Sequence, residues 1–360
     1  MDLFSNVFAF LLQYILPFVI IISVIVFVHE FGHFITAKHF GVFCGEFSIG
    51  MGPLLWSKQG KETQYSIRAI PIGGYVSMAG EADDTKKDVE VPYERTILGI
   101  APWKRIVVML AGIFMNIILA WIIFIGLSMA TGVAPVNEQP VFVEIVENSA
   151  AEKAGFEAGD IIVSLKYEDG RIVELESVSQ LTEEIALYHD TCVYTVNRDG
   201  KLLDITATPE KQEDGTYILG VSIATNYREI KWYESFYYGT MDMLDSSTLI
   251  VKSLSTLFVG KNWDQVSGPV GIVSMVGETV SYGFLSFMNL MAVLSLNIGI
   301  FNAIPIPALD GGRAVITFVE MVTGKTVSEK MLEKLIMTGF ILLLGVMLFA
   351  TFNDVLKLLF

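Results

Sequence analysis

Long apolar runs alternate with polar segments along this chain, and four of the runs are long enough to cross a membrane. They lie at about residues 14–38, 106–130, 284–309 and 335–353. A helix that spans the hydrocarbon core of a bilayer needs about 20 mostly apolar residues. The hydropathy pattern therefore predicts an α-helical membrane protein with four transmembrane helices in a lipid bilayer.

The first polar segment, residues 41–104, contains two stretches in which apolar and polar positions alternate. They are Gly45–Ile49 and Tyr65–Ile70, and glycines separate them. Such alternation bounded by glycine is typical of strands joined by turns. We expect a small membrane-associated β-sheet or re-entrant hairpin, whose open edge pairs with an extended peptide. The alternative is a cytosolic connector that only packs the helices.

The second polar segment, residues 135–225, predicts a compact α+β domain inserted between the second and third spans. One helix-like stretch and four alternating stretches indicate it: 178–188, and 141–146, 160–166, 191–197 and 202–207. Residues 226–265 form the next segment, and their mixture of apolar, hydroxyl and acidic positions is typical of an amphipathic helix on a membrane or beside a cleft. Residues 1–134 and 266–360 then form the N-terminal and C-terminal membrane parts.

The composition agrees with a membrane protein and argues against one class of partner. The chain is 52% hydrophobic, and its mean hydropathy is +0.55, which is too apolar for an ordinary soluble protein. Its net charge of −15 argues against nucleic acid as a partner. Between Thr131 and Gly260 there are 22 acidic and nine basic residues, so nearly all the negative charge lies there. Cys44 and Cys192 do not suggest a disulfide scaffold.

The positions of the basic residues predict the orientation in a cell membrane. No lysine or arginine precedes Lys38, and the basic residues near helix ends lie in 41–104 and in a loop at 313–334. Loops with such an excess face the cytoplasm. The α+β domain and both termini are then extracytoplasmic, and the two cysteines lie on opposite sides of the membrane. The first apolar run lacks a basic region before it, so we expect it to be retained rather than cleaved as a signal peptide.

The first apolar run ends in the sequence His29-Glu30-Phe31-Gly32-His33. An H-E-x-x-H pattern on a helix puts two imidazoles one turn apart on one face, where they can bind one Zn²⁺. Glu30 is then placed as a general base for water that the metal activates. Because ionisable residues are costly at the end of a membrane helix, the pattern predicts a functional site.

A catalytic zinc has three protein ligands, and Asp310 is the candidate for the third. It follows the third apolar run in a sequence that begins Asn302-Ala303-Ile304-Pro305 and ends in Gly311-Gly312. Prolines cannot continue a regular helix, so the backbone should unwind there against protein or a wet cavity. A helix cap is the alternative role for Asp310. We expect Asn116 to join helices, His39 to lie at the surface and His189 to be structural.

These two motifs together resemble the site-2 protease family of intramembrane zinc metalloproteases, and within it the bacterial RseP-type branch. The resemblance covers nearly the whole chain. It implies that His29, His33 and Asp310 are zinc ligands, that Glu30 is the catalytic glutamate, and that Asn302 positions the substrate or the oxyanion. The family often has Gly-Pro in the second span, whereas Gly112 is followed by isoleucine here.

The resemblance also implies roles for the polar segments. Residues 47–75 look like the membrane re-entrant β-loop of the family, and residues 144–209 look like a PDZ domain. The substrate-binding candidates in the loop are Gly50, Gly52, Tyr65, Ser66, Ile67 and Arg68. The implied enzyme is a metalloendopeptidase that performs regulated intramembrane proteolysis on single-pass membrane proteins, such as anti-sigma factors or signal-peptide remnants. Peptide tails are possible partners of the PDZ-like domain.

Two other classes of protein share parts of this pattern. One is a catalytically inactive membrane scaffold whose PDZ-like domain binds partner tails. An intact Glu30 beside two histidines argues against it, because a scaffold has no need of that acid. The other is a transporter with a broken third span, which no internal repeat supports.

Overall fold

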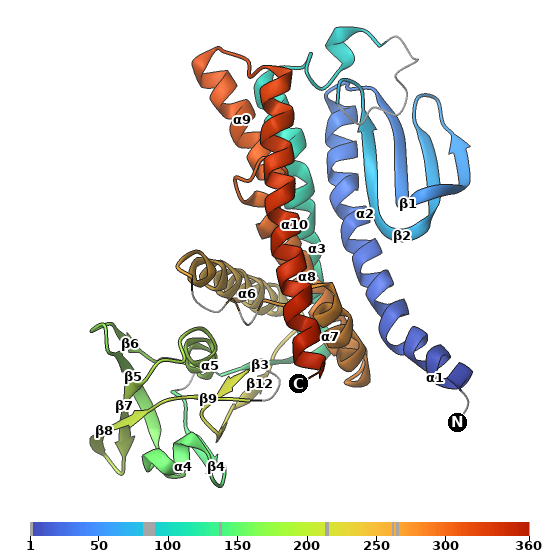
Figure 1. The fold of residues 1–360 in the computed structure, drawn as a ribbon. Coiled ribbons are helices and arrows are strands. Elements are labelled where there is room, and N and C mark those ends of the chain that lie inside the picture. Colours follow the sequence, from blue (N-terminus) through green and yellow to red (C-terminus); the bar gives the residue numbers. More distant parts are fainter. Residues whose placement is uncertain are drawn as a thin grey trace. The chain divides into compact units, whose positions relative to one another are not determined.

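The computed structural model describes residues 3–81, 91–136, 139–212, 216–260, 263 and 266–359, and the chain divides into two compact units (Figure 1). The first unit consists of Met1–Leu127, Asp242–Ser247 and Ser267–Asp354. The second consists of Ser128–Met241, Thr248–Val266 and Val355–Phe360. The amphipathic helix α6 (Ser235–Phe258) contributes to both.

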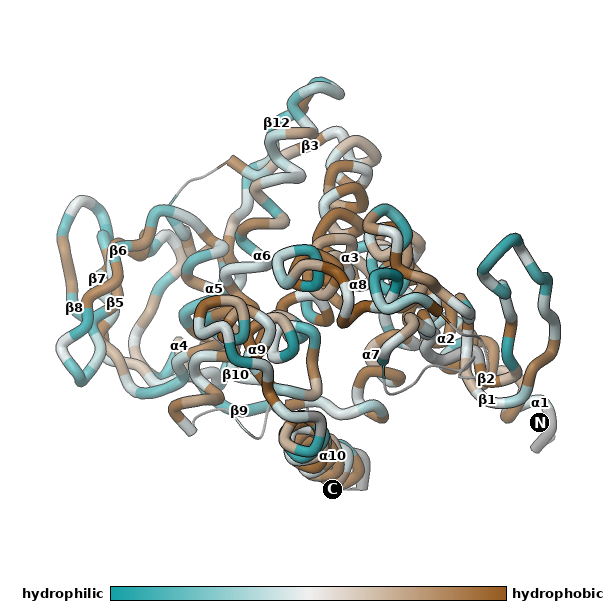
Figure 2. Tube along the Cα trace, turned by 90° about the horizontal axis from the view of Figure 1, so that it is seen from above, coloured by the Kyte–Doolittle hydropathy of each residue, from teal (hydrophilic) through white to brown (hydrophobic). Residues whose placement is uncertain are grey.

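The apolar helices belong mainly to the first unit. They are α1 (Leu3–Phe10), α2 (Leu16–His39), α3 (Pro102–Thr131), α7 (Pro269–Ser281), α8 (Phe284–Ala303), α9 (Asp310–Thr323) and α10 (Glu329–Leu359), and a π-helical turn, Leu11–Ile15, joins α1 to α2. Within the described residues, four helical segments are long and apolar enough to cross a membrane: Val7–His39, Pro102–Thr131, Phe284–Ala303 and Lys330–Lys357. The hydrophobic colouring of α3 and α8 in Figure 2 follows this pattern. The four predicted spans are confirmed.

The unwinding predicted after the third apolar run is confirmed, because α8 ends at Ala303 and Ile304 is extended. The helix of the third span is thus shorter than the apolar run to about 309. Pro305 and Pro307 then exclude a helical continuation. The predicted loop at 313–334 is largely helical, because α9 occupies its first half.

Helix α2 buries one continuous stripe of side chains. Its buried residues are Pro17, Ile21, Ile25, His29, Gly32, His33 and Ala37. A helix turns once in 3.6 residues, so positions four apart stay on one face. The two histidines of the motif therefore continue the buried apolar stripe of the helix, which fixes the face on which they lie.

The predicted β-sheet is formed by two long antiparallel strands, β1 (Cys44–Gln59) and β2 (Gln64–Met78), which curl beside α2 in Figure 1. Both strands bend sharply. Gly50 and Gly52 in β1 have φ of 82° and 81°, and Gly73 in β2 has φ of 88°, which side chains with a Cβ rarely adopt. A 3₁₀ turn, Tyr93–Arg95, lies between the sheet and α3. Each strand thus doubles back, and an apolar cluster around Val42 and Phe47 packs the sheet against α2.

The second unit is an α+β fold with one buried core. Its central sheet has the order β6-β5-β7-β8. Its elements are β3 (Val133–Pro135), β4 (Phe142–Ile145), α4 (Ala150–Ala154), β5 (Ile161–Tyr167), β6 (Ile172–Glu174), α5 (Val178–Leu187), β7 (Cys192–Arg198), β8 (Lys201–Ala207), β9 (Glu210–Lys211), β10 (Tyr217–Ile218), β11 (Val221–Ile223) and β12 (Tyr227–Glu229). The core includes Phe142, Phe156 and Tyr194. The four predicted strands and the helix are confirmed, and both cysteines are free and buried.

Candidate metal centre

Helix α2 brings the two histidines of the H-E-x-x-H sequence together. Their Nε2 atoms are 3.2 Å apart, and the two rings meet at 82°. The exposed fractions of His29 and His33 are 9% and 7%. Gly32 allows α3 to pack closely here, because a Cβ at that position would lie 2.5 Å from the carbonyl oxygen of Ala111. The motif therefore presents two imidazole nitrogens at one point of a tightly packed helix face.

The turn between α8 and α9 brings in a carboxylate from far along the chain. Asp310 is the first residue of α9. The two glycines after it have no room for a side chain, because a Cβ at Gly311 would lie 2.3 Å from the oxygen of Ala303, and one at Gly312 would lie 2.0 Å from that of Ile306. The glycines thus let the start of α9 fold against the turn, and this contact fixes the position of Asp310.

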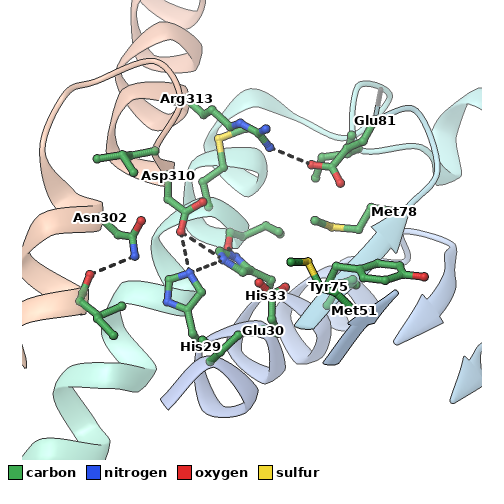
Figure 3. A pocket seen from close by; sticks show the side chains of 18 residues that line it. His29, Glu30, His33, Met51, Tyr75, Met78, Glu81, Asn302, Asp310 and Arg313 are labelled. Carbon is green, nitrogen blue, oxygen red and sulfur yellow. Dashed lines mark hydrogen bonds and ion pairs between the residues drawn. The ribbon is translucent and has the colours of Figure 1, made fainter. Parts of the chain in front are cut away.

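Three side-chain atoms converge at this point (Figure 3). Asp310 Oδ2 lies 3.0 Å from His29 Nε2 and 3.2 Å from His33 Nε2. It is buried, and no donor within the described part of the chain makes an aligned hydrogen bond to it. A tetrahedral zinc with bonds of about 2.0–2.1 Å holds its ligand atoms roughly 3.3 Å apart. The triangle of donor atoms has nearly these dimensions, and two imidazoles with a carboxylate are ligands that zinc accepts.

Helix α3 supports the histidines from behind through positions one turn apart. The ring nitrogen Nδ1 of His33 lies 2.8 Å from the carbonyl oxygen of Val108. A Cβ at Gly112 would lie 2.5 Å from His33 Nε2 and 2.8 Å from His29 Nε2. Asn116 Nδ2 lies 3.3 Å from His29 Nδ1. Val108, Gly112 and Asn116 therefore form a stripe on α3 that bounds both imidazoles, and we call it the histidine cradle.

A cavity of 710 Å³ lies beside the three converging atoms. Glu30 and Asn302 both line it, and Figure 3 shows them on different sides of the cluster. The backbone of Val76 hydrogen-bonds the Glu30 carboxylate, and Asn302 Nδ2 donates to the carbonyl oxygen of Ile298 at 3.0 Å. One carboxylate and one amide thus line the same cavity.

The sheet contributes to this cavity, but not through the residues that the sequence suggested. Tyr65 pairs with both Phe47 and Lys58, and Ser66 and Ile67 likewise have partners on both sides. These residues lie in the middle of the curled sheet, so the prediction of an open edge there was wrong. None of the six candidates of the loop lines the cavity; from the sheet it is lined by Met51, Tyr75, Val76 and Met78.

Several of those candidates instead belong to a buried polar network. The Glu46 carboxylate accepts hydrogen bonds from the Ser66 hydroxyl and, at 2.8 Å, from Arg68. Arg68 also donates to the carbonyl oxygen of Gly52 at 2.8 Å. Burial acts to raise the pKa of Glu46, but hydrogen bonds from Ser66 and Arg68 outweigh it and lower that pKa. Burial, followed by the hydrogen bond to Glu46, raises the pKa of Tyr75 to about 12. The network therefore holds the two bent strands together.

The end of β2 beside α2 has a strand partner on one side only. Gly74 to Met78 each pair with β1, and the described strands offer no second partner. A Cβ at Gly74 would lie 3.7 Å from Glu30 Cγ, so this edge runs past Glu30. Sequence reasoning missed it, although Gly73-Gly74 followed by alternating Tyr75 and Val76 was a signal for a bent strand.

Arg313 and Glu81 were not predicted as site residues. Arg313 Nη1 lies 3.5 Å from Glu81 Oε1, and both side chains line the cavity. Figure 3 shows this ion pair on the far side of Asp310 from Asn302. No motif of the sequence indicated the contact, because the two residues are more than 200 positions apart.

Comparison with known proteins agrees with this arrangement. The sequence model of Peptidase family M50 matches residues 17–346 of this chain. The chain is 35% identical over 346 residues to a Clostridium perfringens protein whose name places it among the zinc metalloproteases, and the match covers 95% of this chain and 98% of that protein. It is 32% identical over 427 residues to the zinc metalloprotease RasP of Shouchella clausii, with 96% and 99% covered.

This chain belongs to Peptidase family M50, the site-2 protease family, as its two motifs predicted. It is accordingly a zinc metalloprotease, and its apolar helices make it a multi-pass membrane protein. The prediction of Zn²⁺ as cofactor is confirmed by the same relatives.

Proposed function

We propose that the chain hydrolyses peptide bonds within transmembrane segments of single-pass membrane proteins, and that its centre is the cluster of His29, His33 and Asp310. The observation that carries this proposal is the convergence of three ligand atoms from two distant motifs to within 3.0–3.2 Å of one another. Zinc held there supplies Lewis-acid activation of water and of the scissile carbonyl.

In this proposal Glu30 is the general acid and base. Glu30 follows His29 directly in the sequence. Its carboxylate lines the cavity and is held by the backbone of Val76. It accepts the proton of the attacking water and returns it to the leaving amine. Asn302, on another side of the cluster, donates an amide hydrogen to the oxygen of the scissile bond. Both groups lie in the one cavity that contains the cluster.

A peptide bond in a transmembrane helix is hydrogen-bonded, so a substrate must be extended before cleavage. We propose that the substrate pairs with the edge Gly74–Met78 as an added strand. This edge has a strand partner on one side only and passes Glu30, whereas Tyr65–Ile67 is paired on both sides. Binding as a strand would keep the substrate unwound beside the centre.

The orientation of the chain follows the distribution of basic residues. We propose that the sheet and the centre lie near the cytoplasmic face of the cell membrane, with both termini and the second unit extracytoplasmic. In this reading the second unit is PDZ-like, and it either binds peptide tails or excludes substrates with bulky outer domains. Substrates of regulated intramembrane proteolysis, already shortened outside, would then enter.

The proposed reaction is tested by reconstituting the full chain in liposomes with a single-pass substrate. Mass spectrometry of the products locates the cut. We expect a cut within the apolar segment, and none with the Glu30→Gln variant. Cleavage only outside that segment, or equal cleavage by the variant, would contradict the proposal.

The edge is tested separately by disulfide cross-linking. Two cysteine variants are compared: Tyr75→Cys and, as a matched position on the same strand, Tyr65→Cys. Each also carries Glu30→Gln, so that the substrate stays uncut. Each is mixed with a set of substrates that carry single cysteines along the transmembrane segment. A strand on the Gly74–Met78 edge predicts cross-links to Cys at position 75 from every second substrate residue. Cross-links at position 65 instead would refute this edge.

A further inference from the structure

The two ring nitrogens of each histidine in the proposed centre have separate tasks. When Nε2 of a neutral imidazole binds a metal, Nδ1 carries the proton and needs an acceptor. His33 has one, because its Nδ1 lies 2.8 Å from the carbonyl oxygen of Val108. The group that faces Nδ1 of His29 must likewise accept a proton from that ring.

The group that faces His29 Nδ1 is the side-chain amide of Asn116. In the structure the amide nitrogen is the nearer end, at 3.3 Å. The amide oxygen is buried and, among the described residues, has no hydrogen-bond partner. A half-turn about the Cβ–Cγ bond exchanges the two ends without moving the backbone. One hydrogen bond, from His29 Nδ1–H to Asn116 Oδ1, then satisfies both atoms.

Asn116 is enclosed where α3 packs against α8, and its amide faces His29. The residue is 0% exposed. Its backbone oxygen accepts a hydrogen bond of 2.8 Å from the hydroxyl of Ser295 on α8, and Gly299 on the same helix would bring a Cβ within 3.4 Å of its Cβ. The side chain is thus held between α8 and the ring of His29. Because a buried amide must find partners, this placement ties it to that ring.

We propose that Asn116 is a positioning residue of the zinc centre, which accepts the Nδ1 proton of His29 and fixes its tautomer and ring orientation. The inference rests on the proposed ligand role of His29. It completes the histidine cradle, in which Val108 orients one ring, Asn116 orients the other, and Gly112 leaves room for both. Sequence reasoning had given Asn116 only a role in joining helices.

The test compares substitutions that keep or remove the acceptor. In Asn116→Asp an oxygen still faces Nδ1, whereas Asn116→Leu has similar size and no acceptor. The zinc dissociation constant of the purified full chain is measured by competition with a chelator. Loss of a partner that orients a ligand typically weakens binding about 10–100-fold, so we expect that loss for Asn116→Leu. Asn116→Asp should stay within about threefold of wild type.

A matched control separates this role from general packing. Ser295→Ala removes the buried hydrogen bond to the backbone of Asn116 but leaves its amide in place, and we expect unchanged zinc affinity. Equal weakening in Asn116→Leu and Asn116→Asp, or in Ser295→Ala, would overturn the inference, as would wild-type affinity in Asn116→Leu. If the wild-type chain itself bound no zinc, the proposed function would fail instead.

A second measurement does not depend on how well the leucine variant folds. The chain has four histidines, so histidine labelled with ¹⁵N gives few signals, and His39→Gln and His189→Gln assign two of them. In the zinc-loaded wild type we expect a slowly exchanging Nδ1–H signal of His29, shifted in Asn116→Asp. A proton on Nε2 of His29, or an Nδ1–H signal that the aspartate leaves unmoved, would contradict the proposal.

Discussion

Replacing Gly112 with alanine should abolish tight zinc binding, because the new methyl group would occupy space that two imidazoles fill. The Cβ would lie 2.5 Å from His33 Nε2, and 2.7 and 2.8 Å from Cε1 and Nε2 of His29. Ordinary van der Waals contact starts at 3.4 Å, so the nitrogen of His33 would have to retreat by about 0.9 Å. Metal sites tolerate ligand displacements of only about 0.2 Å.

Relieving this overlap by separating the helices would break the close packing of α3 against α2 beside the site. A Cβ at Gly32 would meet the oxygen of Ala111 at 2.5 Å, so these backbones touch beside the site. We therefore expect the zinc dissociation constant to rise at least about 100-fold. The cost in unfolding free energy should be about 1–3 kcal/mol, as for other overpacked sites.

The matched control is Gly126→Ala, a glycine of the same helix with open space around its Cβ position. Zinc affinity is measured by chelator competition, and thermal unfolding is followed in the same detergent. The control should bind zinc as the wild type does. If Gly112→Ala kept wild-type zinc affinity and unfolded at the wild-type temperature, the claim that the histidine cradle positions the zinc ligands would be refuted.

Three further predictions concern groups inside and outside the centre. Glu30→Gln should abolish cleavage while about one zinc per chain stays bound, as measured by metal analysis; cleavage that persists would remove Glu30 from the mechanism. Glu46→Gln removes the carboxylate that Arg68 binds and should cost about 1.5–3 kcal/mol in unfolding free energy. Because folding lowers the pKa of Glu46, its contribution is present above the ordinary pKa and is lost as the pH falls through the lowered value; the variant should therefore show less acid-dependent loss of stability. Asp160→Asn weakens the 2.7 Å contact between the buried carboxylate of Asp160 and the partly exposed Arg198 and should cost about 1.5–3 kcal/mol, seen as faster hydrogen exchange across residues 160–198 of the full chain; unchanged exchange would show that the pair contributes little.

The elements that sequence alone predicted were those with a strong local pattern. Apolar length was sufficient for the four spans, and alternation was sufficient for β5, β7 and β8. His29 and His33 could be paired because a helix places residues four apart on one face. Asp310 could be added only because its motif, with two prolines and two glycines, resembles that of the family.

What sequence reasoning missed depends on contacts between distant segments. The alternation of Tyr65–Ile70 predicts a strand but does not say which neighbours pair with it, so an interior strand was taken for an edge. Asn116 in an apolar helix had many possible partners, and only the fold brings it to His29. Arg313 and Glu81 meet because the first turn of α9 lies at the cavity that Glu81 also lines, which no local pattern indicates.

The central claim is that two distant motifs form one zinc centre, and metal analysis of Asp310→Ala beside the wild type tests it most directly. Both full-length chains are purified in detergent, and their zinc content and zinc affinity are measured. We predict about one zinc per wild-type chain, and much weaker binding in the variant, with Gly126→Ala unchanged. If Asp310→Ala bound zinc as well as the wild type, Asp310 would not be a ligand and the two motifs would not form one centre. A folded wild type without zinc affinity would contradict the account.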